Sequence, residues 1–182
     1  WAVWSEIGIF NGITTNPTLL KKAKQNCNIS NISTLIKKAE DLGYNEIHIQ
    51  SWGHSPQKLI DNGIEIGQLK TSNIRIYVKL PVTDIGTKAA KEIISNHIAV
   101  TFTACYEIEQ VLIAAALGAD YIAPYLGRIN DSGANGKENI AKMQRLLNGL
   151  NSSTKLLIAS IREINDINEL ASSGANTFTI SP

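Results

Sequence analysis

The chain has 182 residues, of which 43% are hydrophobic, and its 17 Lys and Arg residues against 16 Asp and Glu residues leave a formal net charge of +1. This length is enough for one sizeable core, and the chain has no basic excess of the kind that nucleic acids or anionic membrane surfaces attract. We therefore expect a single domain over residues 1–182 that binds neither nucleic acid nor membrane.

Seven short apolar segments rich in β-branched and aromatic residues are spaced along the chain, and each predicts a β-strand. They comprise residues 12–15, 46–51, 74–80, 98–103, 121–124, 155–160 and 177–180. Segments with a helical spacing of apolar residues lie between them, at residues 32–42, 56–69, 86–95, 108–117, 136–150 and 164–173. A further helix is expected at residues 2–10, and the stretch 127–136, rich in Gly, Asn and Asp, is expected to be a loop.

The strict alternation of strands and helices predicts a parallel sheet built from βα units. Gly43, Gly118 and Gly174 each follow a helical segment and precede a strand, a place where glycine commonly ends a helix. A doubly wound sheet is disfavoured because no strand is followed by the Gly-rich turn that binds dinucleotides. We therefore expect an α/β fold, a (β/α)8 TIM barrel without its first strand, because no strand precedes the helix expected at residues 2–10.

Lys79 lies within the run Arg-Ile-Tyr-Val-Lys-Leu-Pro at residues 75–81, which otherwise has the composition of a buried strand. An apolar environment disfavours a charged amine, so burial would lower the pKa of Lys79 and make available the neutral amine that attacks a carbonyl group. Schiff-base enzymes activate a lysine in this way. The alternative is a lysine at a strand end whose aliphatic stem is buried while its ammonium group reaches water.

In a (β/α)8 barrel the active site lies at the carboxyl ends of the strands, so the polar residues at those ends are candidates for one site. They are Asn16, Gln50, Lys79, Thr103, Tyr125, Arg128, Ser160 and Arg162. One nucleophile, several neutral hydrogen-bonding groups and two cations together indicate a carbonyl substrate that carries an anion such as a phosphate. Each of these residues alone has a simpler interpretation, as a turn residue, a helix cap or a surface arginine, and Asn16 before Pro17 is typical of a turn.

The cysteines and histidines do not predict a metal site or a disulfide framework. Cys27 and Cys105 are far apart and have no Cys-x-x-Cys or Cys/His spacing, and the three histidines are scattered singly. No apolar run approaches the length of a membrane span, and no basic leader marks a signal peptide. We expect a cytoplasmic protein that uses no metal and no other cofactor.

The residues at the strand ends resemble those of the transaldolases and the related fructose-6-phosphate aldolases. The resemblance runs from Gly-Ile-Thr-Thr-Asn-Pro at residues 12–17 to the last predicted strand, and the motifs occur in the family's order. It implies that Lys79, in Val-Lys-Leu-Pro-Val-Thr, is the Schiff-base lysine. It also implies that Asn16 contacts the substrate and that Arg128, Ser160 and Arg162 bind its phosphate.

Two positions resemble the aldolase branch of this family. Short transaldolases usually carry a glutamate where this chain has Gln50 and a phenylalanine where it has Tyr125, and Thr-Ala-Cys-Tyr at residues 103–106 is similar to the Thr-Ala-x-Tyr of the aldolases. The resemblance implies that Tyr125 is the proton donor and acceptor, with Gln50 and Thr103 positioning a water molecule that relays the proton. It implies a fructose-6-phosphate aldolase, with a transaldolase of the pentose phosphate pathway as the alternative.

Two family features are expected to lie outside residues 1–182. These are an aspartate at the end of the first strand and the last helix, which in the aldolase branch packs on a neighbouring subunit. We therefore expect a homo-oligomer for the full-length protein and read the chain as part of an enzyme that acts on phosphorylated sugars. A sugar-phosphate-binding barrel without catalytic activity is the second alternative, because the first-strand acid is missing.

Overall fold

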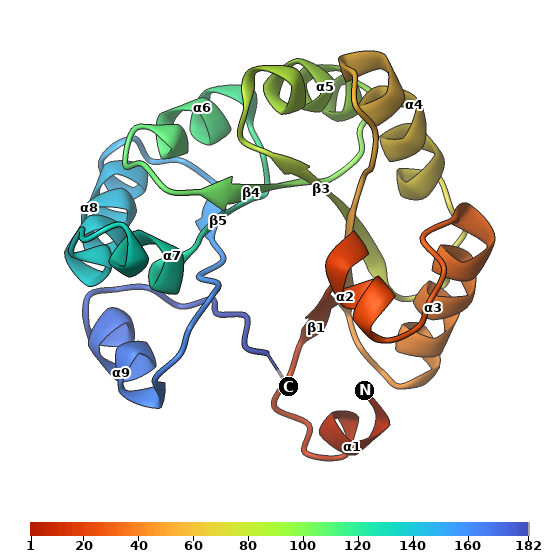
Figure 1. The fold of residues 1–182 in the computed structure, drawn as a ribbon, viewed down its shortest axis with the longest axis horizontal. Helices are drawn as coiled ribbons and strands as arrows, with labels where there is room; N and C mark the ends of the chain where they lie inside the picture. The colour runs from red at the N-terminus through yellow and green to blue at the C-terminus, as the bar shows by residue number, and fades with distance from the viewer. Residues whose placement is uncertain (182) are drawn as a thin grey trace.

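The computed structural model describes residues 1–181, and parallel β-strands surrounded by helices dominate its architecture (Figure 1). Within the described residues, six parallel strands form one sheet in the order of the chain: β1 (Gly12–Thr14), β2 (Glu46–Gln50), β3 (Arg75–Pro81), β4 (Val100–Cys105), β5 (Tyr121–Pro124) and β6 (Lys155–Leu156). The helices are α1 (Ala2–Ser5), α2 (Pro17–Lys22), α3 (Ile29–Asp41), α4 (Pro56–Gly67), α5 (Asp84–Ser95), α6 (Gln110–Leu117), α7 (Leu126–Asp131), α8 (Gly136–Gly149) and α9 (Ile164–Ser172). The expected α/β class is confirmed.

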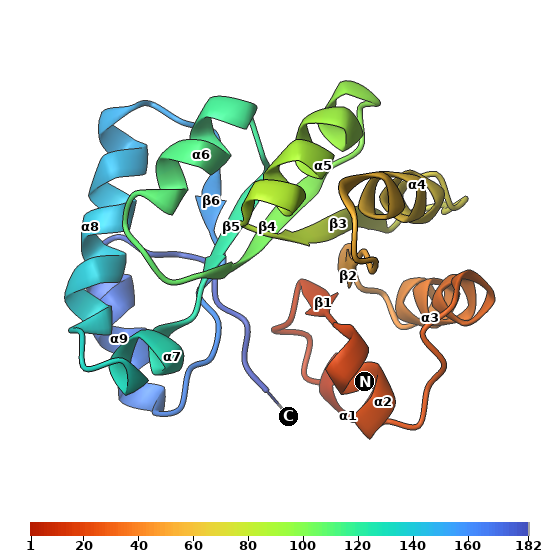
Figure 2. The ribbon, with the colours of Figure 1, turned by 45° about the horizontal axis from the view of Figure 1, so that its top comes forward.

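The sheet curves into an incomplete barrel, and the larger helices lie around its outside (Figures 1 and 2). The amino terminus and the last described residues lie on the open side, near β1. The segment after α9 approaches β1 on that side, where the hydroxyl groups of Thr14 and Thr179 lie 2.9 Å apart in a hydrogen bond. No helix in the described part of the chain is long and apolar enough to cross a membrane.

Short polar side chains cap the helices that follow β2 and β3. The side chain of Ser55 accepts a hydrogen bond from the backbone N–H of Lys58 ahead of α4, where Pro56 takes the first helical position. The hydroxyl of Thr83 plays the same part for α5. At the other end of α6, Gly118 adopts a left-handed conformation with φ of 71°, which ends the helix.

The side chains of the sheet divide between two apolar layers, as alternation along a strand requires. The larger layer lies between sheet and helices and includes Ile47, Val78 and Phe102, all fully buried. The second lies inside the barrel and is built from aromatic and apolar residues: Tyr77, Tyr121, Ala123 and Leu157. The interior is therefore packed toward the amino ends of the strands, which leaves the carboxyl ends for a site.

The structure departs from the expected elements at both ends of the chain. Residues 177–180 form no strand and contribute a single bridge, between Ile158 and Phe178, and residues 155–160 form a ladder over only two residues. The segment around Thr179 meets β1 through a side-chain hydrogen bond instead of a backbone ladder, so it has a sheet partner on one side only. The helix expected at residues 2–10 is limited to α1.

Two short helices were not predicted. Residues 127–136 were expected to be a loop, but α7 occupies Leu126–Asp131 because Leu126 and Ile129, one turn apart, both reach the buried core. The Asn16-Pro17 turn continues into α2, since the proline suits a first helical position and the Asn16 side chain caps the helix. Packing and capping stabilise these helices despite their length.

Candidate active site

Lys79 lies on the central strand β3 with its side chain inside the barrel. The residue is 6% exposed, and its Nζ atom donates a hydrogen bond to the backbone oxygen of Thr15 at 3.1 Å. Burial lowers the pKa of Lys79 to about 8, from the usual 10.5. The amine is thus buried and does not extend into water.

The strands on either side of β3 place two further candidate residues close to the lysine. Gln50 ends β2 and is the register partner of Lys79, so the two side chains lie next to each other on the same face of the sheet. Thr103, on β4, is the register partner of Pro81 and is buried. A carboxamide and a hydroxyl therefore flank the strand that carries the amine.

Tyr125 joins this group through Thr103. It follows β5 directly, and its hydroxyl lies 2.7 Å from the Oγ1 atom of Thr103 in a hydrogen bond. The pairing of β4 with β5 is irregular between Phe102 and Cys105, and Ala104 has a φ of 56° within this bulge. A left-handed conformation is unfavourable for alanine and is typical of a site where the backbone must redirect a side chain.

Ser160 and Arg162 lie beside Gly127, at the start of α7. The N–H of Gly127 donates to the backbone oxygen of Ser160 at 2.9 Å. A Cβ atom at position 127 would lie 2.7 Å from Nε of Arg162 and 3.0 Å from Oγ of Ser160, closer than side chains normally approach. Ser160 itself has a φ of 59°. Only a glycine lets these two residues come so near to the helix that carries the exposed Arg128.

Arg162 already has an anionic partner. Its NH1 and NH2 atoms donate to the two carboxylate oxygens of Asp131 at 2.7 and 2.6 Å, and about half of each side chain is exposed. The hydrogen bond with Arg162 lowers the pKa of Asp131, and the charge of Arg128 acts in the same direction. Sequence reasoning missed Asp131, since an acidic residue among the small and polar residues at 127–136 carries no distinct signal.

The Asn16 side chain serves as a helix cap. Its Oδ1 atom accepts from the backbone N–H of Leu19 at 2.9 Å and begins α2. The residue before it, Thr15, supplies the oxygen that binds Nζ of Lys79. Asn16 therefore lies one residue from the contact with the lysine, and its half-buried amide group also has the structural role that the Asn-Pro pair predicts.

A polar layer lies on the amino-terminal side of the lysine. The His48 ring stacks on Tyr77 with centroids 4.6 Å apart, and its Nδ1 atom lies 2.8 Å from Oγ1 of Thr101, the register partner of Lys79. Burial lowers the pKa of His48, and the Glu46 carboxylate, 3.7 Å away, only partly opposes this. An uncharged His48 places no cation under Lys79, in accord with burial as the cause of the lysine's low pKa.

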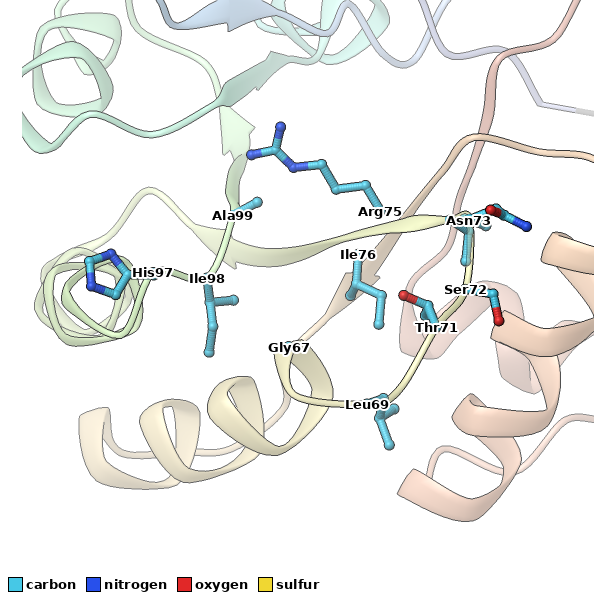
Figure 3. A pocket seen from close by; sticks show the side chains of 11 residues that line it. Gly67, Leu69, Thr71, Ser72, Asn73, Arg75, Ile76, His97, Ile98 and Ala99 are labelled. Carbon is cyan, nitrogen blue, oxygen red and sulfur yellow. The ribbon is translucent and has the colours of Figure 1, made fainter.

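Two cavities of the described chain lie elsewhere. One, of about 420 Å³, is lined by the loops that precede β3 and β4, including Ser72, Asn73 and His97 (Figure 3). The other, of about 350 Å³, is lined by the segments that precede β1 and β2. Both therefore face the amino ends of strands, away from Lys79. Within the described residues, no group of three or more His, Cys, Asp or Glu side chains could hold a metal ion.

Parallel strands in chain order, outer helices and a buried lysine among polar strand-end residues define an incomplete α/β barrel with its candidate site at the carboxyl ends of the strands. A family-level sequence profile described as Transaldolase/Fructose-6-phosphate aldolase matches residues 3–182. The chain belongs to this family.

Curated relatives agree with the family. A probable transaldolase of Brucella ovis is 30% identical over 178 residues, which cover 98% of this chain and 78% of the relative. A probable transaldolase of Maricaulis maris is 31% identical over 177 residues, covering 97% and 78%. Family and names indicate an enzyme of the transaldolase or aldolase type. Among solved structures, a mandelate oxidase mutant matches with a TM-score of 0.48 and 13% identity over 83% of this chain and 59% of its own.

Proposed function

We propose that the protein is a Schiff-base aldolase that cleaves or forms the C3–C4 bond of fructose 6-phosphate. The observation that carries this proposal is the buried amine of Lys79, whose pKa of about 8 leaves a substantial uncharged fraction near neutral pH. The amine lies at the end of the strands where barrel enzymes bind substrates, among side chains that are polar and carry no negative charge.

The proposed reaction begins when neutral Lys79 adds to the C2 ketone, and the adduct takes up a proton and loses water to form an iminium ion. A base then removes the proton of the C4 hydroxyl, the C3–C4 bond breaks, and its electron pair passes to the iminium nitrogen to give an enamine. Glyceraldehyde 3-phosphate departs as the aldehyde product. Protonation of the enamine at C3 and addition of water release dihydroxyacetone and restore the amine.

Tyr125 is the proposed proton acceptor and donor. Its hydroxyl is held by Thr103 at 2.7 Å, and Thr103 lies on the strand next to that of Lys79. Gln50, the register partner of the lysine on the other side, would help to hold the water molecule through which the proton passes. None of the three residues is a carboxylate, so the phenolate form of Tyr125 would accept the C4 proton and the phenol formed in this way would return it to C3 of the enamine.

The proposed phosphate site comprises Arg128, Ser160 and Arg162, which lie around the start of α7. Guanidinium groups and a hydroxyl suit a phosphate ester. We further propose that residues 1–182 belong to one (β/α)8 barrel domain, in which a first strand would fill the open side between β1 and the segment around Thr179.

A transaldolase is the second candidate, and the names of the curated relatives favour it. In that reaction the enamine would not be released. It would attack the aldehyde of erythrose 4-phosphate, so the three-carbon unit passes to a four-carbon acceptor. Gln50 and Tyr125 support the aldolase instead, because short transaldolases usually carry other residues at these positions.

Trapping with borohydride tests the Schiff base. The protein is incubated with fructose 6-phosphate or dihydroxyacetone, reduced with borohydride and analysed by peptide mass spectrometry. We expect one adduct, on Lys79. Lys79→Arg should abolish it, because a guanidinium group is not deprotonated to a nucleophile, whereas Lys91→Arg on the exposed face of α5 should leave it intact. An adduct on another lysine, or none, contradicts the proposal.

Product analysis separates the two candidates. Release of glyceraldehyde 3-phosphate from fructose 6-phosphate is followed with and without erythrose 4-phosphate. Release without acceptor supports the aldolase, and release that requires acceptor identifies a transaldolase. Thermal stabilisation by the sugar phosphate that persists in Lys79→Ala, without adduct or turnover, would instead indicate a binding protein.

A further inference from the structure

We infer that Gln110 and Tyr106 are positioning residues for Tyr125, so that the segment after β4 fixes the orientation of the proposed proton-transferring phenol. The inference rests on the proposed function, since it concerns the residue proposed to transfer the proton. Neither residue is among the strand-end candidates, and both act through contacts with neighbouring residues.

The side chain of Gln110 forms hydrogen bonds with three backbone groups near the site. Its side-chain Oε1 atom accepts hydrogen bonds from the backbone N–H groups of Tyr106 and Glu107, at 2.8 and 3.0 Å. Its Nε2 atom donates to the backbone oxygen of Val82 at 3.2 Å, just beyond the strand that carries Lys79. The amide group thus links the segment after β4 to the end of β3, and it uses its oxygen and its nitrogen to do so.

Gln110 begins a helix but bonds to the backbone that precedes that helix. It is the first residue of α6, and the side chain of the preceding residue, Glu109, forms no capping hydrogen bond. The Gln110 side chain is directed back to the chain before the helix, where it satisfies two N–H groups that would otherwise face solvent. The amide group therefore fixes the backbone at Tyr106, the first residue after β4.

Tyr106 then packs against Tyr125. The two ring centroids are 5.7 Å apart with an interplanar angle of 81°, an edge-to-face contact. Thr103 holds the hydroxyl of Tyr125 at 2.7 Å, so the phenol is held at one end by a hydrogen bond and along its ring by Tyr106. The bulge with left-handed Ala104 lies between Thr103 and Tyr106, and it lets both side chains of one short segment reach the same phenol.

The hydrogen bond with Thr103 and the ring contact with Tyr106 should affect the rate of proton transfer by Tyr125. Proton transfer requires the donor and acceptor atoms to be within hydrogen-bond reach in the correct orientation, and a misplacement of about 1 Å can cost on the order of a hundredfold in rate. Formation of the iminium at Lys79 depends on the amine and not on the position of Tyr125. Loss of either positioning residue should therefore slow bond cleavage while adduct formation continues.

The experiment compares these two steps in the same samples of the full chain. Tyr106→Ala and Gln110→Ala are each expected to lower the rate of glyceraldehyde 3-phosphate release roughly tenfold or more, while the yield of borohydride-trapped Lys79 stays within about twofold of the unmodified protein. Tyr106→Phe, which keeps the ring, should retain most of the cleavage rate. Gln144→Ala is the matched control, because Gln144 is a half-buried residue of α8 whose side chain bonds only to Asn148 among the described side chains.

Each outcome has a defined meaning. Selective loss of cleavage in both alanine variants, with recovery in Tyr106→Phe, supports the inference. Unchanged cleavage overturns it, and so does a parallel fall in trapping and cleavage, because that result indicates a structural role. If Tyr106→Ala does not fold by circular dichroism, Tyr106→Leu takes its place. Absence of any adduct in the unmodified protein overturns the proposed function itself, which keeps the two failures apart.

Discussion

The buried amine of Lys79 should lower the stability of the protein in a pH-dependent way. Its pKa is about 8 in the folded chain and 10.5 for an ordinary lysine, so the folded chain binds this proton more weakly. At about 1.4 kcal/mol for each pKa unit, the cost is about 3 kcal/mol at pH 7 and roughly 1 to 2 kcal/mol at pH 9.5. The unfolding free energy therefore increases as pH rises from about 8 to 10.5. In this range the folded chain has largely released the Lys79 proton, whereas the unfolded chain still binds it.

The substitution Lys79→Met replaces the amine by an apolar group of similar length and removes this dependence. It also removes the hydrogen bond to the oxygen of Thr15, which subtracts a constant of about 1 to 3 kcal/mol at both pH values. The lost hydrogen bond therefore changes the difference in unfolding free energy between variant and parent by a constant amount, and it does not alter how that difference varies with pH. We expect the variant's advantage in unfolding free energy to fall by about 2 kcal/mol between pH 7 and pH 9.5.

Urea denaturation of both proteins, followed by circular dichroism at each pH, measures this change. Other groups that titrate in this range contribute equally to parent and variant and cancel in the difference. Lys91→Met, on the exposed face of α5, serves as the control and should give a difference that does not change with pH. A difference for Lys79→Met that is constant, or that grows toward pH 9.5, would refute the argument that burial alone depresses the lysine pKa.

Other substitutions test the remaining parts of the site. Thr103→Val removes the hydroxyl that holds Tyr125 with little change of shape, and cleavage should fall roughly tenfold while borohydride trapping persists, as parallel kinetic and trapping assays would measure. Gly127→Ala places a methyl group against Ser160 and Arg162, so thermal denaturation should reveal a loss of about 1 to 3 kcal/mol, with a raised KM for phosphorylated substrates only. Asp131→Asn releases Arg162 from its ion pair, and inorganic phosphate should then inhibit at a severalfold lower concentration; unchanged inhibition would mean that Arg162 takes no part in anion binding.

The parts of the site that follow from strand order were predictable from the sequence. Once the segments around residues 46–51, 74–80 and 98–103 are taken as parallel neighbours, Gln50, Lys79 and Thr103 must end adjacent strands at one edge, and the structure has this register. The β-branched and aromatic residues around Lys79 predicted a buried strand, although they left open whether its ammonium group reaches water. Both inferences use local pattern and topology, which a sequence displays directly.

The parts that depend on contacts between distant segments were not predictable. Arg162 and Asp131 are 31 residues apart, and nothing local marks their pairing. The edge-to-face contact of Tyr106 with Tyr125 depends on a bulge at Ala104, and an alanine carries none of the signal that a glycine would give there. The helix α7 was missed because its two core contacts, Leu126 and Ile129, stand among residues typical of loops.

The strands that carry the site differ in length, so the regions around β3 and β6 should differ in the free energy needed for local opening. Lys79 lies in the middle of the sheet, where β3 is paired over five residues with β2 and four with β4, whereas β6 pairs with β5 over only two. Opening free energy rises with the number of buried contacts and backbone hydrogen bonds that must break. Fluctuations should therefore release Ser160 and Arg162 well before they disturb the amine, so a protein near its unfolding transition would still form an adduct with a small ketone after losing its hold on the phosphate.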